Sequence, residues 1–139
     1  MRTVLDCNVV VSGLIRPDRA PAQLLNALIE GRFEAILSPA ILEEYRRILR
    51  AKKVRRYIVL SSDGVESLLA GLALAAVWVE DQTSTSPIVV EDPSDDVCLL
   101  AAAEGTADYV VSGDQHLLAV KRYEGIPIVS PREFLDTLR

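Results

Sequence analysis

The sequence contains few side chains that bind soft metals or act as nucleophiles beside a histidine. Among its 139 residues are two cysteines and one histidine, His116. A zinc site or a serine–histidine–aspartate triad is therefore poorly supported. Cys7 and Cys98 lack metal-ligand spacing, and two cysteines give little basis for a disulfide framework. We expect both to be reduced and to serve as small, buried apolar residues.

Long hydrophobic runs are also absent, and no apolar segment approaches the roughly 20 residues that a membrane-spanning helix needs. The first residues, MRTVLDCNVVVSG, carry only Arg2 before the apolar stretch and lead directly into a predicted strand, so we expect no signal peptide. Half of the residues are apolar and a quarter are charged, as in globular proteins. We expect one domain, residues 1–139, that is cytoplasmic and does not contact a membrane.

The net charge of −5 argues against a generally basic nucleic-acid-binding protein, but the charges are unevenly distributed. The segment RRILRAKKVRR, residues 46–56, holds seven of the fifteen Lys and Arg residues and no acid. The rest of the chain holds eight basic and twenty acidic residues, a net charge of −12. Such opposite charges can guide a polyanion to one edge while a metal ion neutralises another.

Short apolar segments alternate with helical patterns along the chain. We expect residues 3–11 to form a buried strand and its exit turn, and further strands at residues 33–37, 77–80, 109–111 and 126–129. Helix-start signals are Ser38-Pro39, Asp63 with Glu66, Asp92-Pro93, and Ser130 with Glu133. This alternation predicts an α/β fold with a parallel sheet covered on both faces.

Acidic residues follow two of the predicted strands. Asp6 follows the first strand and Asp114 comes shortly after the strand at 109–111. Binding sites in open α/β sheets form beyond the carboxyl ends of the strands. Asn8 lies two residues after Asp6, so a locally extended chain would direct both side chains to the same side. A helix cap is an alternative role for Asp114.

A third acid lies on the helix after Ser38. At 100° per residue, the apolar face of this helix centres near Tyr45, and Glu43 lies almost opposite in solvent. Glu44 lies at the border of the apolar face, beside Ile41 and Ile48, and is the acid expected to face the sheet edge. Taken alone, Glu44 also fits an ordinary acid at a helix border.

The fourth acid comes from the segment EDPSDD, residues 91–96. Asp92 and Asp95 have a capping explanation, because acids favour a helix N-terminus. Asp96 falls on the face shared by Leu100 and Ala103, where a carboxylate without a cation would be costly. Asp96 is therefore the first candidate ligand from this segment, and Asp95 the second.

Four carboxylates without histidine or cysteine partners suit a hard cation such as Mg²⁺ or Mn²⁺, which prefers oxygen ligands. Asp6, Glu44, Asp96 and Asp114 together therefore predict a metal-dependent phosphodiesterase. Each acid alone is weak evidence, and the combination is much more specific than its parts.

These segments resemble the PIN-domain family of nucleases, which includes the VapC-type toxins of bacterial and archaeal toxin–antitoxin pairs. LDCNVVVSGL is similar to the opening strand of the family with its acid and following Asn, and ILEEYRRIL to its helix with an inward Glu. DPSDDVCLLAAAEGTADYVVSGDQHLL is similar to the region of the third and fourth acids, and IPIVSPREFL to the closing strand and helix. The resemblance covers nearly the whole chain. It implies a three-layer α/β/α fold around a mainly parallel sheet of about five strands.

The resemblance also implies residue roles. Asp6, Glu44, Asp96 and Asp114 would be the catalytic metal ligands, and Asn8 and Ser112 would orient ligands or the attacking water. Cys7 departs from the Thr or Ser usual after the first acid, which removes a hydroxyl from the surroundings of the ligands.

The implied reaction is hydrolysis of an RNA phosphodiester with one or two Mg²⁺ or Mn²⁺ ions. The resemblance implies products with a 5′-phosphate and a 3′-hydroxyl, a homodimer, and, in the toxin setting, an antitoxin whose basic side chain could replace the metal charge. The RNA backbone would meet the basic segment through Arg46, Arg47, Arg50, Lys52 and Lys53. A solvated helix end, whose cations complement the helix dipole, is the alternative for that segment.

Two other functions remain as alternatives. A non-catalytic RNA-binding or regulatory module would use the basic segment without metal-dependent cleavage. A magnesium-dependent small-molecule phosphatase of the haloacid-dehalogenase type usually needs a second Asp two residues after the first, where this chain has Asn8. A receiver domain is a third possibility, but the expected acidic pair and lysine are not evident.

Overall fold

A computed structural model describes residues 1–82 and 96–139 of the chain. Six strands of the described part form a sheet in the order β3-β2-β1-β4-β6-β5. They are β1 (Arg2–Leu5), β2 (Glu34–Leu37), β3 (Val77–Trp78), β4 (Tyr109–Val111), β5 (Arg122–Tyr123) and β6 (Ile126–Val129). Only the pairing of β5 with β6 is antiparallel within this sheet. The predicted mainly parallel sheet is therefore confirmed, with one strand more than expected.

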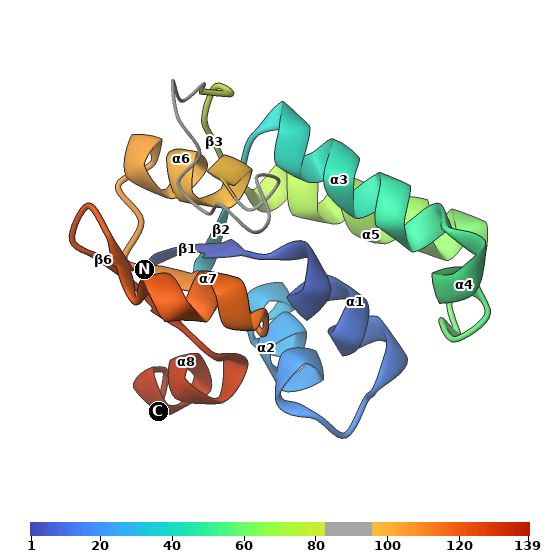
Figure 1. Ribbon diagram of the computed structural model, residues 1–139. Coiled ribbons are helices and arrows are strands. Elements are labelled where there is room, and N and C mark those ends of the chain that lie inside the picture. The colour runs from blue at the N-terminus through green and yellow to red at the C-terminus, as the bar shows by residue number, and fades with distance from the viewer. Residues whose placement is uncertain (83–95) are drawn as a thin grey trace.

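Helices cover the sheet on both sides, as Figure 1 shows. They are α1 (Cys7–Ile15), α2 (Ala20–Ile29), α3 (Pro39–Arg50), α4 (Lys52–Arg55), α5 (Ser62–Ala75), α6 (Asp96–Glu104), α7 (Gln115–Val120) and α8 (Pro131–Thr137). Helices α3, α5 and α6 lie on one side, and α1, α2 and α8 on the other. This arrangement confirms the three-layer α/β/α architecture. Among these helices, none combines the length and the apolar character needed to cross a membrane.

Two parts of the strand prediction were wrong. Val9–Val11 belong to α1 and do not continue the exit of the first strand, because the Asp6 side chain accepts a hydrogen bond from the Cys7 N–H and starts a helix there. The short strand β5 was not predicted. A tight turn at Glu124 and Gly125, with φ angles of 50° and 79°, joins it to β6. A strand of only two residues leaves no recognisable pattern in the sequence.

The predicted helix starts are confirmed at two positions and wrong at a third. The Ser38 side chain accepts from the Ile41 N–H at 3.3 Å, and Ser130 forms the expected capping box with Glu133. Helix α5 is capped by Ser61, whose hydroxyl accepts from the Gly64 N–H at 3.0 Å, and not by Asp63. The expected start at Asp92-Pro93 lies outside the described residues.

The core includes an aromatic cluster that holds α8 against the sheet. The buried Phe134 ring meets Phe33 edge-on at 5.0 Å between centroids, and Tyr109 at 5.5 Å. Such pairs add stabilisation beyond the burial of their surface area. Helix α8 therefore packs against Tyr109 of β4 and against Phe33, which directly precedes β2.

We expect Phe134→Ala to lower the free energy of unfolding by about 3–5 kcal/mol, because it leaves a cavity at a fully buried site. Urea denaturation measures this change. The control Leu74→Ala alters a side chain that is 89% exposed, and should change stability by less than about 0.5 kcal/mol. Equal effects of the two substitutions would contradict the assigned core.

Candidate metal and nuclease site

A cavity of about 430 Å³ opens at the carboxyl ends of β1 and β4. Three of the four predicted acids line it: Asp6 after β1, Glu44 on α3 and Asp114 after β4. Its other described lining residues include the polar Asn8 and Ser12 and the apolar Val11, Ile41, Ile48 and Val97. The fold thus brings together three acids from distant parts of the sequence, of which Asp6 and Asp114 are more than a hundred residues apart.

Asp6 is the most constrained of these acids and is only 7% exposed. Its Oδ1 accepts from the Cys7 N–H at 2.8 Å, and its Oδ2 accepts from the Ser112 hydroxyl at 2.6 Å. Both bonds to a carboxylate are charge-assisted and strong. They hold the plane of the Asp6 carboxylate at the end of β1.

Ser112 links Asp6 to Asp114 and is fully buried. The Asp114 N–H donates to the Ser112 Oγ at 2.9 Å, while that hydroxyl donates to Asp6. The Asp114 side chain also accepts from the His116 N–H at 2.9 Å, which makes it the N-cap of α7. Capping and a place in the cavity are therefore compatible for Asp114.

Asn8 lies in the first turn of α1 and does not continue an extended chain, so the geometric reason given for its placement was wrong. It nevertheless lines the cavity, and its Oδ1 accepts from the Gly113 N–H at 3.3 Å. This bond ties the start of α1 to the loop after β4. The first turn of α1 therefore places Asn8 in the same cavity as Asp6, as an extended chain was expected to do.

Helix geometry separates Glu44 from Glu43. The Glu43 side chain is 69% exposed and pairs with Arg46, whereas the half-buried Glu44 lines the cavity. Glu44 also pairs with Arg47, whose Nη2 lies 2.7 Å from Oε1. The carboxylate therefore has a cationic partner at the mouth of the cavity.

The fourth predicted acid lies beside the cavity. Asp96 is the first residue of α6 and is 9% exposed. The next two residues, Val97 and Cys98, line the cavity, but Asp96 is not among the described lining residues. Asp95 and Asp92 lie outside the described residues.

The chemistry of the donor set fits a hard cation, because Asp6, Glu44 and Asp114 present carboxylate oxygens to one cavity. Within residues 1–82 and 96–139, however, no three acidic, histidine or cysteine side chains are close enough to hold an ion as they stand. Glu44 points to Arg47 and Asp114 to the start of α7. Side-chain rotation would be needed to bring the carboxylates onto one ion.

Two residues of the cavity were not identified as polar contributors from the sequence. The Tyr45 hydroxyl donates to the Leu5 carbonyl, and the Cys7 thiol donates to the Glu44 carbonyl at 3.9 Å. Burial raises the pKa of Tyr45 well above its usual range, so the phenol remains a donor. A tyrosine at the centre of an apolar helix face could have signalled this bond, since buried phenols usually find a partner.

Cys7 and Cys98 are free thiols, and only Cys98 is the buried residue that the sequence predicts for both. Both line the cavity, Cys98 buried and Cys7 half-buried. Burial, followed by the negative charges of Glu44 and Asp6, raises the pKa of the Cys7 thiol to about 12. Cys7 is therefore a neutral hydrogen-bond donor at physiological pH and a poor nucleophile.

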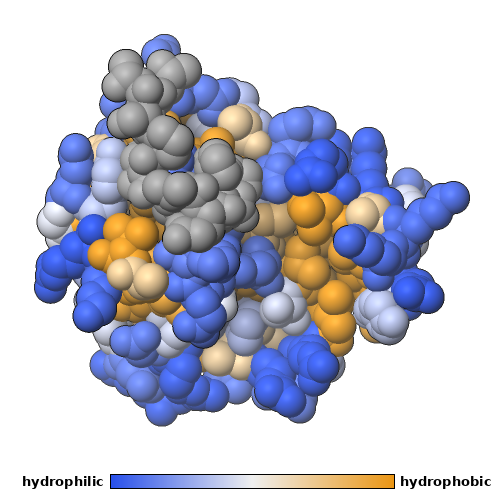
Figure 2. Space-filling view, in the orientation of Figure 1, coloured by the Kyte–Doolittle hydropathy of each residue, from blue (hydrophilic) through white to orange (hydrophobic). Residues whose placement is uncertain are grey.

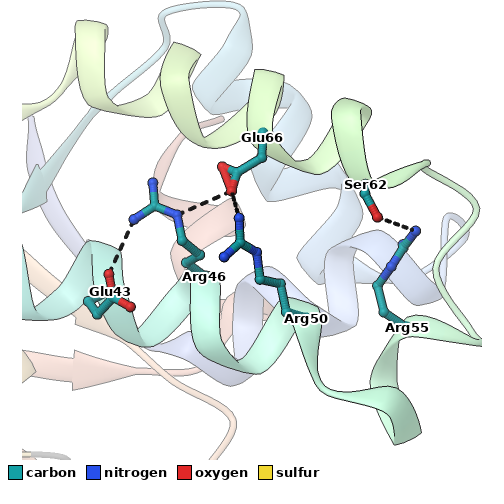
Figure 3. A network of polar contacts seen from close by, with 6 residues as sticks. All are labelled: Glu43, Arg46, Arg50, Arg55, Ser62 and Glu66. Carbon is teal, nitrogen blue, oxygen red and sulfur yellow. Dashed lines mark hydrogen bonds and ion pairs between the residues drawn. The ribbon is translucent and has the colours of Figure 1, made fainter.

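The basic segment forms the end of α3 and the short helix α4. Figure 3 shows Arg46 and Arg50 both reaching the Glu66 carboxylate on α5, at 3.3 Å and 2.5 Å. These ion pairs connect α3 to α5. Lys52 and Lys53 are exposed on α4, and the described structure contains no ion pair for either. The segment thus combines a structural part with a part open to an external anion.

Fold and cavity define a three-layer α/β protein with carboxylates gathered at the carboxyl edge of its parallel sheet. A family model described as PIN domain matches residues 2–116, and the chain belongs to this family. Membership supports a nuclease, a hydrolase of nucleic acids. The resemblance inferred from the sequence motifs is confirmed at the level of the family.

Three known proteins match nearly the whole length of the chain. An uncharacterized protein of Methanocaldococcus jannaschii, MJ1680, is 25% identical over 144 residues, which cover 98% of this chain and 90% of that protein. The crystal structure of PAE2754 from Pyrobaculum aerophilum matches with a TM-score of 0.63 and 16% identity, over 99% of this chain and 89% of the other. VapBC2 from Rickettsia felis, solved with a DNA fragment from its promoter, matches with a TM-score of 0.58 and 13% identity, over 94% and 98%. These structural matches show a shared fold.

The raised pKa of Cys7 predicts slow alkylation by iodoacetamide. At pH 8 the thiolate population should be about a thousandfold below that of an ordinary cysteine. The greater nucleophilicity of a thiolate with a high pKa offsets part of this difference. We expect Cys7 in the folded protein to react at least about tenfold more slowly than in urea, as measured by mass spectrometry of its peptide. The folded rate should keep rising between pH 9 and 11, and a plateau near pH 9 would contradict the shift.

Proposed function

We propose that the protein is a Mg²⁺- or Mn²⁺-dependent ribonuclease, with residues 1–139 acting as one catalytic domain. The main support is the placement of Asp6, Glu44 and Asp114 around one cavity in a PIN-domain fold. Carboxylates at the carboxyl edge of a parallel sheet are suited to hold a cation against a phosphate. RNA as the substrate rests on the family resemblance together with the basic segment at residues 46–56.

In this proposal Asp6, Glu44 and Asp114 hold the metal, and Asp96 joins them from the start of α6. When bound, the ion lowers the pKa of a water molecule and stabilises negative charge on the phosphate and the leaving oxygen. Ser112 keeps Asp6 and Asp114 in a defined relative orientation through its two hydrogen bonds. Asn8 supports the loop that carries Asp114 through the Gly113 N–H.

Arg47 would stabilise the cluster of carboxylates while no metal ion is bound. Neighbouring carboxylates repel one another and disfavour a phosphate. The Arg47 guanidinium neutralises Glu44 through two hydrogen bonds, at 2.7 Å and 3.3 Å. Its side chain is 65% exposed, so it can leave Glu44 and turn towards an entering phosphate.

We further propose a toxin role in a toxin–antitoxin pair, with a cytoplasmic location and a homodimer as the working form. A structural neighbour is a VapBC2 assembly, which supports an antitoxin partner. Figure 2 shows hydrophobic surface in the hollow where α1 lies beside α3. Val11 of α1 and Ile48 of α3 line the cavity together with Glu44. This surface suits a partner segment that has apolar side chains and one basic residue.

A non-catalytic RNA-binding module is the second candidate function. The pairing of Glu44 with Arg47 favours it, as does the lack of a ready group of three metal ligands in the described part of the chain. This candidate predicts RNA binding through the basic segment and no cleavage when metal is added. The two functions are therefore separated by one assay with and without Mn²⁺.

Purified protein should cleave RNA when Mg²⁺ or Mn²⁺ is present and stop when a chelator is added. Asp6→Asn and Glu44→Gln should each reduce cleavage by more than about 100-fold, beyond the loss typical of residues that only orient ligands. Both replacements are close in shape, so circular dichroism should show an intact fold. Glu43→Gln removes a charge one residue away, at an exposed position, and should leave cleavage within about twofold. Unchanged cleavage by the first two variants would refute the assigned site.

Lys52→Gln combined with Lys53→Gln should weaken RNA binding, because two exposed cations in the basic segment are lost. If both contact phosphates, the slope of log affinity against log salt concentration should fall by about 1.4 for single-stranded RNA. Fluorescence anisotropy with a labelled oligoribonucleotide measures this slope. Lys121→Gln with Arg132→Gln removes the same charge elsewhere, and an equal effect would show that only net charge matters.

A further inference from the structure

Two side chains form reciprocal links between the end of β1 and helix α3. The Tyr45 hydroxyl reaches from α3 to the carbonyl of Leu5. In the other direction, the Cys7 thiol reaches from the start of α1 to the carbonyl of Glu44. Leu5 and Cys7 are the residues directly before and after Asp6. Their partners on α3 are Tyr45 and Glu44. The links therefore span the two acids directly.

The end of β1 is a firm anchor for these links. Leu5 pairs with Val111 of β4, and the Asp6 N–H donates to the Val111 carbonyl at 2.9 Å. Leu5 and Tyr45 are 2% and 3% exposed. A hydrogen bond between such buried groups has no water to compete with it, so it tolerates little change of geometry.

The other polar contacts of helix α3 in the described structure lie at its first turn and on the side that faces α5. The Ala40 N–H donates to the Asp81 side chain at 3.1 Å, and Arg46 and Arg50 reach Glu66 on α5. Glu44 itself pairs with Arg47 within the helix. Ile41 and Leu49 are buried where α3 packs among α1, α5 and α6, but such apolar packing is non-directional. The Tyr45 bond joins the residue after Glu44 to the residue before Asp6, so it is the directional contact that bears most closely on the distance between the two acids.

We propose that Tyr45, assisted by Cys7, is a positioning residue that sets the separation of Asp6 and Glu44 so that both carboxylates can bind one metal ion. The inference rests on the proposed metal-dependent function. It assigns a role to a side chain whose ring belongs to the core and whose hydroxyl serves the site. It also assigns a role to Cys7, whose thiol donates to the Glu44 carbonyl.

The test compares Tyr45→Phe with Tyr109→Phe. The first removes the linking hydroxyl and keeps the ring, while the second removes a hydroxyl from the start of β4, at the opposite end of that strand from the cavity. Mn²⁺ binding is measured by electron paramagnetic resonance of the free ion, without any substrate. Tyr45→Phe should raise the Mn²⁺ dissociation constant about 10-fold, and Tyr109→Phe should leave it within about twofold.

Saturating metal separates positioning from general damage. Tyr45→Phe should recover most of the wild-type rate of RNA cleavage when Mn²⁺ is raised about 10-fold, because the ligands themselves remain. A purely structural tyrosine would lower the urea midpoint and leave the Mn²⁺ affinity of the folded protein unchanged. That result, with a wild-type protein that binds Mn²⁺, overturns the inference alone. A wild-type protein that binds no Mn²⁺ overturns the proposed metal dependence, and the inference with it.

Cys7 provides a second test should Tyr45→Phe fail to fold. Cys7→Ala removes the donor to Glu44, whereas Cys7→Ser keeps one. The alanine variant should bind Mn²⁺ about threefold more weakly, and the serine variant should bind at least as tightly as Cys7→Ala and closer to the wild type. Equal affinities of the wild type and Cys7→Ala, measured on folded protein, would show that the reciprocal link has no part in metal binding.

Discussion

The parallel pairing of β1 with β4 is the constraint on which the site depends. It places Leu5 opposite Val111, so the chain leaves the two strands at Asp6 and Ser112 side by side. The Ser112 hydroxyl then donates to Asp6 and accepts from the Asp114 N–H. A shift of one residue in this register would direct Asp6 to the other face of the sheet, because side chains alternate along a strand.

Hydrogen bonds and one ion pair offset the negative charge of the acids around this site. Asp6 receives two hydrogen bonds, Asp114 caps α7, and Glu44 has Arg47 beside it. Each acid therefore has a partner in the folded protein, which limits the repulsion that carboxylates around one cavity would otherwise create. In the proposed enzyme, a bound cation and phosphate would displace some of these partners and leave others in place.

The basic segment has a divided role that its composition does not reveal. Arg46 and Arg50 share Glu66 and thereby hold α3 against α5, while Lys52 and Lys53 on α4 remain exposed. Since α3 also carries Glu44 and Tyr45, these ion pairs help to keep the acidic cavity and the exposed cations in a constant relation. The exposed cations of α4 therefore directly follow the helix that carries Glu44 and Tyr45.

The sequence by itself determined much of the architecture, because periodicity and capping are local properties of the chain. The strands at Tyr109–Val111 and Ile126–Val129, the Ser38 and Ser130 caps, and the separation of Glu44 from Glu43 all follow from neighbouring residues. Local patterns failed where a single hydrogen bond decided the backbone, as at Asp6, where a cap turned a valine-rich segment into helix.

Only the tertiary structure decided which polar groups meet across the fold. Ser112 on Asp6, Tyr45 on Leu5 and Cys7 on Glu44 join segments between 37 and 106 residues apart. No pattern along the chain encodes such contacts, because they depend on strand register and on how α3 docks on the sheet. The sequence supplied the four acids of the candidate site, whereas the fold brought three of them to one cavity and placed Asp96 at its side.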